Sequence, residues 1–359
     1  MITNIKSFIT PKALKRGILL GLVSLIGSSV FALGFLGKTI LNKYRVFLQT
    51  AELSHQTVIQ FVKSTIQAEP INQLSILVLG TDEIENRPDF PQLTDSIILA
   101  QVQPSHNKVQ LLSLPRDLWS NDYKTKINAL YQYGRDKNPD QPTQFPQEVI
   151  STLTQQDINH TLVISLAQLE SLIQILGTIE VDVPVGFRDD QFPRNDVDIT
   201  KETDPLKLYE TVTFVAGKQQ MDGERALKYI RSRHSVDPLV GTDLGRTVRQ
   251  QQVIEAIFEQ IMDLSQYWYE PQRAGQLFSF YKEHFEESLP LSKLLVLVRQ
   301  MYQSDQPFQF TSNSLPIFPD DPEGVIEHPT YLHPYQNQWV YVINDLSRFR
   351  QFISKSLTL

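Results

Sequence analysis

The stretch Leu112-Ser113-Leu114-Pro115-Arg116-Asp117 decides the predicted fold of this chain. It completes the alternating run that starts at Val109, which is typical of a β-strand, and Pro115 cannot donate a hydrogen bond to a strand ladder. The charged pair Arg116-Asp117 is therefore expected directly after a strand's C-terminal end. Open α/β sheets usually bind their ligands at that edge.

Two earlier stretches predict neighbouring strands. The run 74–79 is short and almost entirely apolar, as in a strand that is covered on both faces, and the run 96–102 is a second strand. Each strand is associated with an acid: Asp82 follows the first strand, Asp95 introduces the second and Asp117 follows the third. We therefore expect these carboxylates near strand ends.

The remainder of the chain alternates between helical and strand patterns. Helices are predicted at 127–133, 147–154, 166–176, 223–229, 244–264, 272–287 and 292–302, with a last one after Asp345, and further strands at 161–164, 179–183, near Phe308 and at 339–343. The fold class that follows is α/β, with a central mixed β-sheet flanked by helices. The acidic segment 187–203 is interpreted as a solvated loop, because its acids lack the spacing of a calcium cage.

The N-terminal region predicts one transmembrane helix at 17–38, after a cytoplasmic N-terminus at 1–16. Residues 17–37 carry no charge, and at about 1.5 Å per residue they can cross a hydrocarbon core of about 30 Å. Positive charges precede this run at Lys6, Lys12, Lys15 and Arg16, so the chain after it is expected outside the cell. The alternative is a cleaved signal peptide, with small residues around Phe31. A juxtamembrane helical stalk is expected at 39–71.

Composition narrows the function. The formal net charge is −7, so bulk attraction to nucleic acid is not expected and an anion site must be built locally. The chain has no cysteine, which excludes disulfides and thiolate sites.

A cluster of arginines between Tyr229 and Gln250 predicts a phosphate site. Arg246, Arg249 and Gln250 are spaced i, i+3, i+4 and share one helix face, and Arg231 and Arg233 lie where the preceding helix ends. Guanidinium groups bind phosphate through two parallel hydrogen bonds, so these side chains together with Arg116 suit a pyrophosphate. The alternative is that each arginine pairs with a nearby acid on the surface.

The carboxylates Asp82 and Asp95 predict a Mg²⁺ site. Magnesium typically takes one or two carboxylates together with phosphate oxygens. The alternatives are that both residues cap the loop between two strands, and that Asp117 orders Arg116. The sequence has no Gly-rich phosphate loop, no Ser-His-Asp set and no histidine cluster with ligand spacing. Phosphoryl transfer by positioning and charge neutralisation remains available to it.

A series of spaced motifs resembles the LytR-CpsA-Psr (LCP) family from about residue 74 to 261. They are Leu79-Gly80-Thr81-Asp82, Thr94-Asp95-Ser96, Leu112 to Asp117, Lys126-Ile127-Asn128-Ala129, Gly177 with Val181 to Pro184, Gly217 with Met221-Asp222-Gly223, Ala226 to Arg233, and Asp243 to Gln250. The resemblance implies an LCP catalytic domain at 72–264. The part beyond Leu264 carries no motif of the family, and a C-terminal extension of helices and strands packed on the catalytic domain is expected at 265–359.

The same resemblance implies a phosphotransferase of the bacterial plasma membrane. Such enzymes move a glycopolymer from a polyprenyl-pyrophosphate carrier to a hydroxyl of peptidoglycan, and the catalytic domain lies outside the cell. It also implies site roles. Arg116, Asp117 and Asp82 would be catalytic; Arg116, Lys126, Arg231, Arg233, Arg246, Arg249 and Gln250 would bind the pyrophosphate; Asp82 and Asp95 would hold Mg²⁺ or Mn²⁺.

One position departs from the family pattern. The family usually has an arginine two residues before the second aspartate, where this chain has Leu93, and Arg87 in the same loop is the candidate substitute. Two other functions stay open, and Leu93 bears on the first of them. One is a polyprenyl-pyrophosphate binding protein or pyrophosphatase without transfer. The other is a LytR-type transcriptional attenuator, which the acidic net charge and the outward topology disfavour.

Overall fold

The computed structural model describes residues 37–82, 91–194, 197, 204–235, 241–263 and 265–358. The predicted transmembrane helix lies outside this range except for Gly37 and Lys38, which begin helix α2 (Gly37–Thr50). Arg87 also lies outside it. Within the described ranges, every helix is too short or too polar to cross a bilayer.

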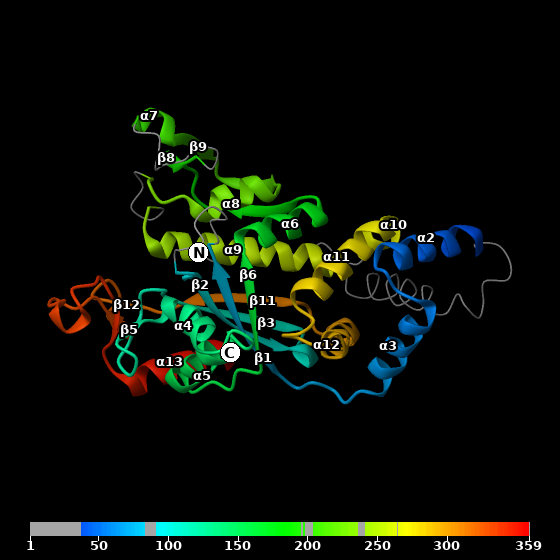
Figure 1. The fold of residues 1–359 in the computed structure, drawn as a ribbon, viewed down its shortest axis with the longest axis horizontal. Coiled ribbons are helices and arrows are strands. Elements are labelled where there is room, and N and C mark those ends of the chain that lie inside the picture. Colours follow the sequence, from blue (N-terminus) through cyan, green and yellow to red (C-terminus); the bar gives the residue numbers. More distant parts are fainter. Residues whose placement is uncertain are drawn as a thin grey trace. The chain divides into compact units, whose positions relative to one another are not determined.

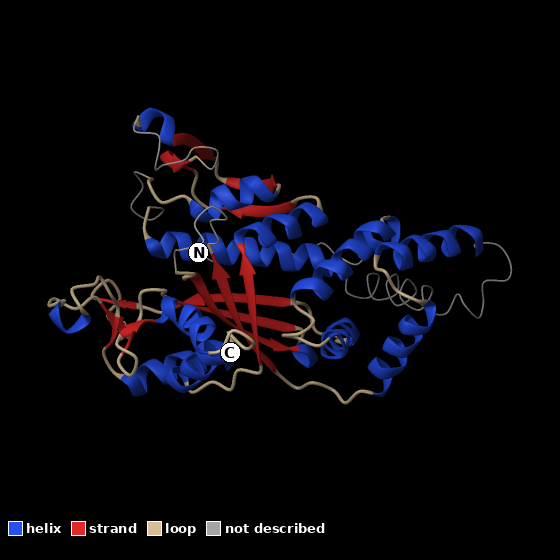
Figure 2. Cartoon of the chain, viewed as in Figure 1, coloured by secondary structure: helices blue, strands red, loops and turns tan. Residues whose placement is uncertain are grey.

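A five-stranded sheet forms the centre of the fold (Figures 1 and 2). Its strand order is β11-β3-β2-β1-β6, from β1 (Leu74–Thr81), β2 (Thr94–Gln103), β3 (Lys108–Leu114), β6 (His160–Ser165) and β11 (Gln309–Ser314). Helices flank it, so the predicted α/β class with a central mixed sheet is confirmed. The strand near Phe308 was predicted, but its place at the edge beside β3 was not.

Residue contacts divide the chain into two compact units. The first contains the described residues up to Ile76, together with Gln101–Gln110 and Ile261–Thr311; the second contains Leu77–Ala100, Leu111–Gln260 and Ser312–Leu359. The domain boundaries expected from the sequence stay a prediction.

The second unit contains a large apolar core. Strand residues such as Leu77, Leu99 and Leu112 are at most 2% exposed and cluster with residues of three helices. These helices are α4 (Leu130–Lys137), α5 (Gln144–Thr154) and α13 (Leu346–Thr358). Because each fully buried Leu or Phe side chain contributes roughly 1.5–3 kcal/mol, this cluster holds the helices on the sheet.

Helix α8 (Gly223–Arg231) belongs to a second layer of the same unit. Its N-cap is Asp222, whose side chain accepts a hydrogen bond from the backbone N–H of Arg225. It contacts α6 (Leu166–Leu176), and its residue Tyr229 packs its ring against Phe187 and Phe214. Strands β7 (Ile179–Val183) and β10 (Gly217–Met221) pair antiparallel in a small sheet, and both precede α8 in the sequence. Helix α9 (Asp243–Met262) then follows.

The prediction of a loop at 187–203 is wrong for the first part of this segment. Residues Phe187–Pro193 form strand β8, which pairs antiparallel with β9 (Tyr209–Phe214). Phe187, Asp189 and Phe192 are buried on this strand. A register shift between Asp189 and Phe192 breaks the simple alternation. This irregularity, together with the acids, hid the strand pattern in the sequence. A short helix, α7 (Pro205–Leu208), precedes β9.

The first unit is mostly helical. Helix α2 packs on α11 (Pro271–His284), and α3 (His55–Gln67) packs on α12 (Leu291–Gln303). The α2–α11 approach is close, because a Cβ added to Gly275 would lie 2.6 Å from the Cβ of Thr50. The unit also contains α10 (Ser265–Tyr269) and the turn η1 (Pro104–His106).

The C-terminal part of the second unit adds short strands. Strands β12 (Ile317–Phe318), β13 (Ile326–Glu327) and β14 (Val342–Ile343) form one small sheet. Earlier in the chain, directly after β3, strand β4 (Trp119–Ser120) pairs with β5 (Thr125–Lys126). A 3₁₀ turn, η3 (His333–Tyr335), lies between β13 and β14.

Candidate active site

The strand ends that carry the predicted acids meet at one edge of the sheet. Asp95 and Ser96 at the start of β2 line the same pocket as Ser113 and Leu114 at the end of β3. A Cβ added to Gly80, near the end of β1, would lie 3.0 Å from the Cβ of Ser96. The end of β1 and the end of β3 therefore both lie beside the start of β2, which places Asp82, Asp95 and Arg116 at one edge.

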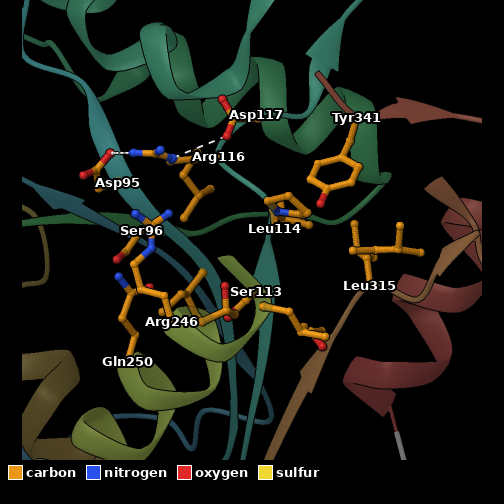
Figure 3. Close-up of a pocket in the computed structure, with 17 residues that line it drawn as sticks. Asp95, Ser96, Ser113, Leu114, Arg116, Asp117, Arg246, Gln250, Leu315 and Tyr341 are labelled. Atoms are coloured by element: carbon orange, nitrogen blue, oxygen red, sulfur yellow. Dashed lines mark hydrogen bonds and ion pairs between the residues drawn. The ribbon is translucent and has the colours of Figure 1, made fainter. Parts of the chain in front are cut away.

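A pocket opens at this edge (Figure 3). Its lining includes five of the predicted site residues, namely Asp95, Arg116, Asp117, Arg246 and Gln250. The opposite wall comes from Leu315, Ile317 and Tyr341. The pocket therefore combines a charged side with an apolar and aromatic side.

A chain of alternating charges runs along the pocket edge. Lys126 Nζ lies 2.6 Å from Asp117 Oδ1, and Asp117 Oδ2 lies 3.4 Å from Arg116 Nε. Arg116 Nη1 donates to Asp95 Oδ1 at 2.5 Å, and Arg233 Nη2 lies 3.4 Å from Asp95 Oδ2. Three cations alternate with two carboxylates, so this row of five side chains carries a net positive charge. The residues span positions 95 to 233, and only folding brings them together.

Backbone hydrogen bonds fix the segment that carries Arg116. After Pro115 ends the strand, the N–H of Leu118 donates to the Pro115 carbonyl at 2.9 Å. The Arg116 carbonyl accepts from Asn128 N–H at 3.1 Å, and Lys126 pairs with Trp119 in the β4–β5 ribbon. The Arg116-Asp117 pair therefore sits on a braced turn, which limits the entropy lost when a ligand binds.

Helix α9 contributes Arg246 and Gln250 from its first turns. The two side chains lie one turn apart on the pocket side, as the spacing predicted (Figure 3). Arg246 is 4% exposed, and its backbone N–H donates to the Thr242 carbonyl at the start of the helix. Backbone N–H groups at a helix start favour an anion, and the Arg246 guanidinium adds a full positive charge there.

Arg249 points elsewhere on the same helix. Its Nε donates to the Tyr229 carbonyl at 2.8 Å, and its Nη2 donates to the Ser232 carbonyl. The guanidinium lies over the rings of Phe187 and Tyr229, at 5.1 and 5.9 Å from their centroids. Burial lowers the pKa of Arg249. These contacts join α9 to the C-terminal end of α8, and Arg249 is not among the residues that line the pocket.

The segment after α8 is held by Asp189, a residue that the sequence did not single out. This side chain is 0% exposed and accepts hydrogen bonds from the N–H groups of Arg233 at 2.9 Å and His234 at 3.2 Å. It positions Arg233 for its contact with Asp95. The sequence offered only the flanking Phe187 and Phe192 as a signal, and the register shift between Asp189 and Phe192 interrupts their alternation.

Arg231 and Asp82 complete the predicted set. The Arg231 guanidinium lies 5.6 Å from the centroid of the Phe192 ring, and Asp82 is half-buried directly after β1. Neither residue lines the pocket, and neither does Lys126 or Arg233. Among the described residues, no group of three or more His, Asp or Glu side chains converges as a metal cage. The two carboxylates that the sequence assigned to a metal, Asp82 and Asp95, lie at this edge, and a third one there, Asp117, is paired with Lys126 and Arg116.

Comparison with known proteins gives a consistent family. The profile of the LytR_cpsA_psr family matches residues 42–327. The polyisoprenyl-teichoic acid–peptidoglycan teichoic acid transferase TagU of Enterococcus faecalis is 27% identical over 60% of this chain and 63% of its own length. TagV of Bacillus subtilis, described by the same activity, is 27% identical over 66% of this chain and 57% of its own length. This chain therefore spans about three fifths of the length of these relatives.

Solved structures share the fold. The crystal structure of B. subtilis TagV has a TM-score of 0.51 at 20% identity, over 80% of this chain and 97% of that one. A protein of E. faecalis described as a transcriptional regulator has a TM-score of 0.53 at 21% identity, over 82% of this chain and 90% of that one.

Proposed function

Since this chain belongs to the LytR_cpsA_psr family, we propose that it is a membrane-anchored phosphotransferase. Its donor would be a glycopolymer on a polyprenyl-pyrophosphate carrier, and its acceptor a hydroxyl of peptidoglycan. The observation that carries this proposal is the alternating chain from Lys126 to Arg233, centred on Arg116 at the pocket edge. The activity described for the TagU and TagV relatives supports the choice of donor and acceptor.

The cations of the site suit a pyrophosphate. Arg116 and Arg246 line one pocket, and Arg233 reaches its edge through Asp95. Arginines bind phosphate oxygens in a planar, two-point geometry and stabilise the charge that grows as a phosphate leaves. Arg116 would exchange its contact with Asp95 for the ligand, while Asp117 and Lys126 keep its guanidinium oriented. Asp117 is therefore proposed as a positioning residue.

Asp82 and Asp95 fit a divalent metal. Both are carboxylates at one sheet edge, and Mg²⁺ or Mn²⁺ with one or two protein carboxylates commonly completes its shell with phosphate oxygens and water. Such a metal would neutralise negative charge on the pyrophosphate when bound. Gln250 on the pocket wall would complete the pyrophosphate set with Arg231. Arg249, which binds the carbonyls of Tyr229 and Ser232, would instead hold the helix that carries Arg246 and Gln250.

The transfer step is a displacement at phosphorus. The acceptor oxygen forms a bond to the phosphorus that carries the glycan, and the bond from that phosphorus to the bridging oxygen breaks. Polyprenyl phosphate leaves with the electron pair, and the hydroxyl proton passes to water in the net reaction. The product is a phosphodiester between glycan and acceptor, so no covalent enzyme intermediate is required.

The proposed location follows from the sequence of the N-terminus. The uncharged run 17–37 with positive residues before it supports a single-pass protein of the bacterial plasma membrane. Its N-terminus would be cytoplasmic and its catalytic domain outside, where peptidoglycan lies.

The test uses the full chain in lipid vesicles with a polyprenyl-pyrophosphate-linked oligosaccharide, Mg²⁺ and peptidoglycan. Label in the insoluble wall fraction is the expected result. Free sugar phosphate without wall label would instead identify a pyrophosphatase, the alternative that Leu93 favours by replacing the family's usual arginine. Binding of lipid without either product would identify a carrier protein. A salt-dependent shift of duplex DNA would support the attenuator function.

A further inference from the structure

Three aromatic rings form a continuous surface in the C-terminal part of the second unit. The rings of His328 and Trp339 are stacked, with centroids 4.9 Å apart and an interplanar angle of 27°. Tyr341 meets Trp339 edge to face, with centroids 4.7 Å apart and an angle of 77°. His328 is exposed, and Trp339 remains 42% exposed despite both contacts. We call His328, Trp339 and Tyr341 the aromatic platform.

The platform is held rigidly. His328 Nδ1 donates to the Val340 carbonyl at 2.9 Å, which fixes the ring plane. Val340 is 0% exposed, and the partly buried Tyr341 packs against the apolar core, so both side chains hold the segment that carries Trp339. The exposure of Trp339 therefore does not result from loose packing of this segment.

The platform is continuous with the candidate active site. Tyr341 lines the pocket together with Arg116 and Asp117 (Figure 3). The Tyr341 N–H donates to the Asp117 carbonyl at 3.0 Å, and its carbonyl accepts from Trp119 N–H at 2.8 Å. These two backbone hydrogen bonds connect the segment that carries the charged side chains to the segment that carries the rings. A ligand that enters the pocket by its phosphate can extend over the platform.

The chemistry of the platform differs from that of the pocket. The pocket edge presents alternating charges, whereas the platform presents the exposed aromatic side chains of His328 and Trp339. An aromatic face is electron-rich, so it attracts the weakly positive C–H groups of a flat partner and excludes water from them. The apolar face of a pyranose ring has this shape and polarity. A ligand with a sugar next to a phosphate would therefore place its phosphate in the pocket and its sugar on the platform.

We propose that the aromatic platform binds a pyranose ring of the glycan whose phosphate occupies the pocket beside Arg116. The proposal rests on the proposed transferase function and deepens it by naming a sugar subsite. His328, Trp339 and Tyr341 all follow residue 327, where the match to the family profile ends. The subsite is thus a feature of this chain's own C-terminal segment.

The proposed occupant is the first sugar of the donor, and the acceptor sugar of peptidoglycan is the competing occupant. Two binding probes separate them. The donor probe is a polyprenyl-pyrophosphate-linked N-acetylglucosamine, compared with the same lipid pyrophosphate without the sugar. The acceptor probe is N-acetylchitotetraose, a soluble β-linked oligomer. Binding to the full chain in lipid nanodiscs is measured by calorimetry.

The decisive variants change the ring faces. Trp339→Ala should weaken the donor probe about tenfold, as expected when a stacked ring is removed, while Trp339→Phe should stay within about threefold of the wild type. The sugar-free lipid pyrophosphate should bind unchanged to both. Tyr209→Ala is the matched control, because Tyr209 is 39% exposed on β9 in the same unit and lies outside the platform.

The outcomes separate this inference from the transferase function. Equal binding of the donor probe to wild type and Trp339→Ala, or weakening of the acceptor probe alone, would overturn the donor-sugar subsite. If wall transfer is nevertheless retained, the transferase function stands without it. If instead Arg116→Ala binds lipid pyrophosphate like the wild type while Trp339→Ala loses the sugar, the phosphate site is misplaced and the subsite survives. His328→Ala should weaken the same sugar probe, and a selective loss there repeats the test without changing Trp339.

Discussion

Arg116 donates to Asp95 at 2.5 Å, from the turn after β3 to the start of β2. This contact joins the proposed phosphate-binding cation to a proposed metal-binding carboxylate. Both side chains are about one quarter exposed, at 23% and 26%. A partly exposed ion pair contributes little to stability, so the contact is easily exchanged for a ligand. In the proposed function, phosphate would replace Asp95 as the partner of Arg116, and a metal would replace Arg116 as the partner of Asp95.

Arg116→Ala should reduce transfer by at least about a hundredfold, because the variant loses the central cation that would stabilise the charge growing on the polyprenyl phosphate as it leaves. The fold should persist, since Asp117 keeps its contact with Lys126 and Asp95 keeps its contact with Arg233. Label transfer and thermal unfolding measure the two effects. Arg188→Ala is the control, because it also removes one arginine–aspartate pair, with Asp190, at the surface. Substantial unfolding of Arg116→Ala would make Arg116 a structural residue.

Asp82→Asn should raise the Mg²⁺ concentration needed for half-maximal transfer roughly tenfold or more, because it replaces one of only two proposed carboxylate ligands. Titration of activity with Mg²⁺ measures the shift. Asp122→Asn, at an exposed position after β4, should leave the curve unchanged. An unshifted curve for Asp82→Asn removes this residue from the metal site.

Arg249→Met should destabilise the fold by about 2–4 kcal/mol. The variant keeps the length of the side chain but leaves the carbonyls of Tyr229 and Ser232 without their guanidinium donor, and buried acceptors without partners are costly. Urea unfolding measures the loss, and Arg249→Lys should recover part of it. Wild-type stability together with weaker pyrophosphate binding would show that Arg249 serves the ligand instead.

The pH dependence of stability should show the burial of Tyr229. Burial raises the pKa of this phenol to about 12 in the folded state, from 10.0 when it is free. The folded state thus keeps a proton that the unfolded state loses, so the stabilisation is complete below pH 10 and is lost as the pH rises through 12. The loss should reach about 2–3 kcal/mol. It is measured as the difference in unfolding free energy between wild type and Tyr229→Phe, and a pH-independent difference contradicts it.

Leu93→Arg should strengthen pyrophosphate binding about three- to tenfold. Leu93 is 36% exposed two residues before Asp95, so an arginine there has room to reach the phosphate and adds one cation to the site. Calorimetry with a short polyprenyl pyrophosphate measures the gain. Leu93→Gln adds polarity without charge and should show little gain; equal gains in both variants would mean that charge is not the cause.

Local signals in the sequence were sufficient for most elements. The helix predicted at 166–176 is α6, and the strand predicted at 179–183 is β7, with the same bounds. Asp222 caps α8, and Pro115 ends β3, both as expected. These features depend on capping, hydrophobic periodicity and the missing N–H of proline, which act over a few residues.

Long-range packing decided the features that the sequence did not reveal. Arg249 was grouped with Arg246 by its spacing, yet its guanidinium is bound to the carbonyls at the end of α8. Asp189 looked like a solvated acid, yet it is fully buried beneath the N–H groups of residues 233 and 234. In both cases the partner lies more than fifteen residues away in the chain, as the separations of 17, 20, 44 and 45 residues show.

The sequence by itself determined the α/β class, most helices and strands, and which charged residues stand at strand ends. Only the tertiary structure decided that Asp95 lies between Arg116 and Arg233. It also decided that Arg249 binds the carbonyls after α8 and that Tyr341, in contact with Trp339, lines the pocket. The physical reason is range. Backbone preferences and periodicity act between near neighbours, whereas the direction of a side chain depends on which distant surfaces the core brings against it.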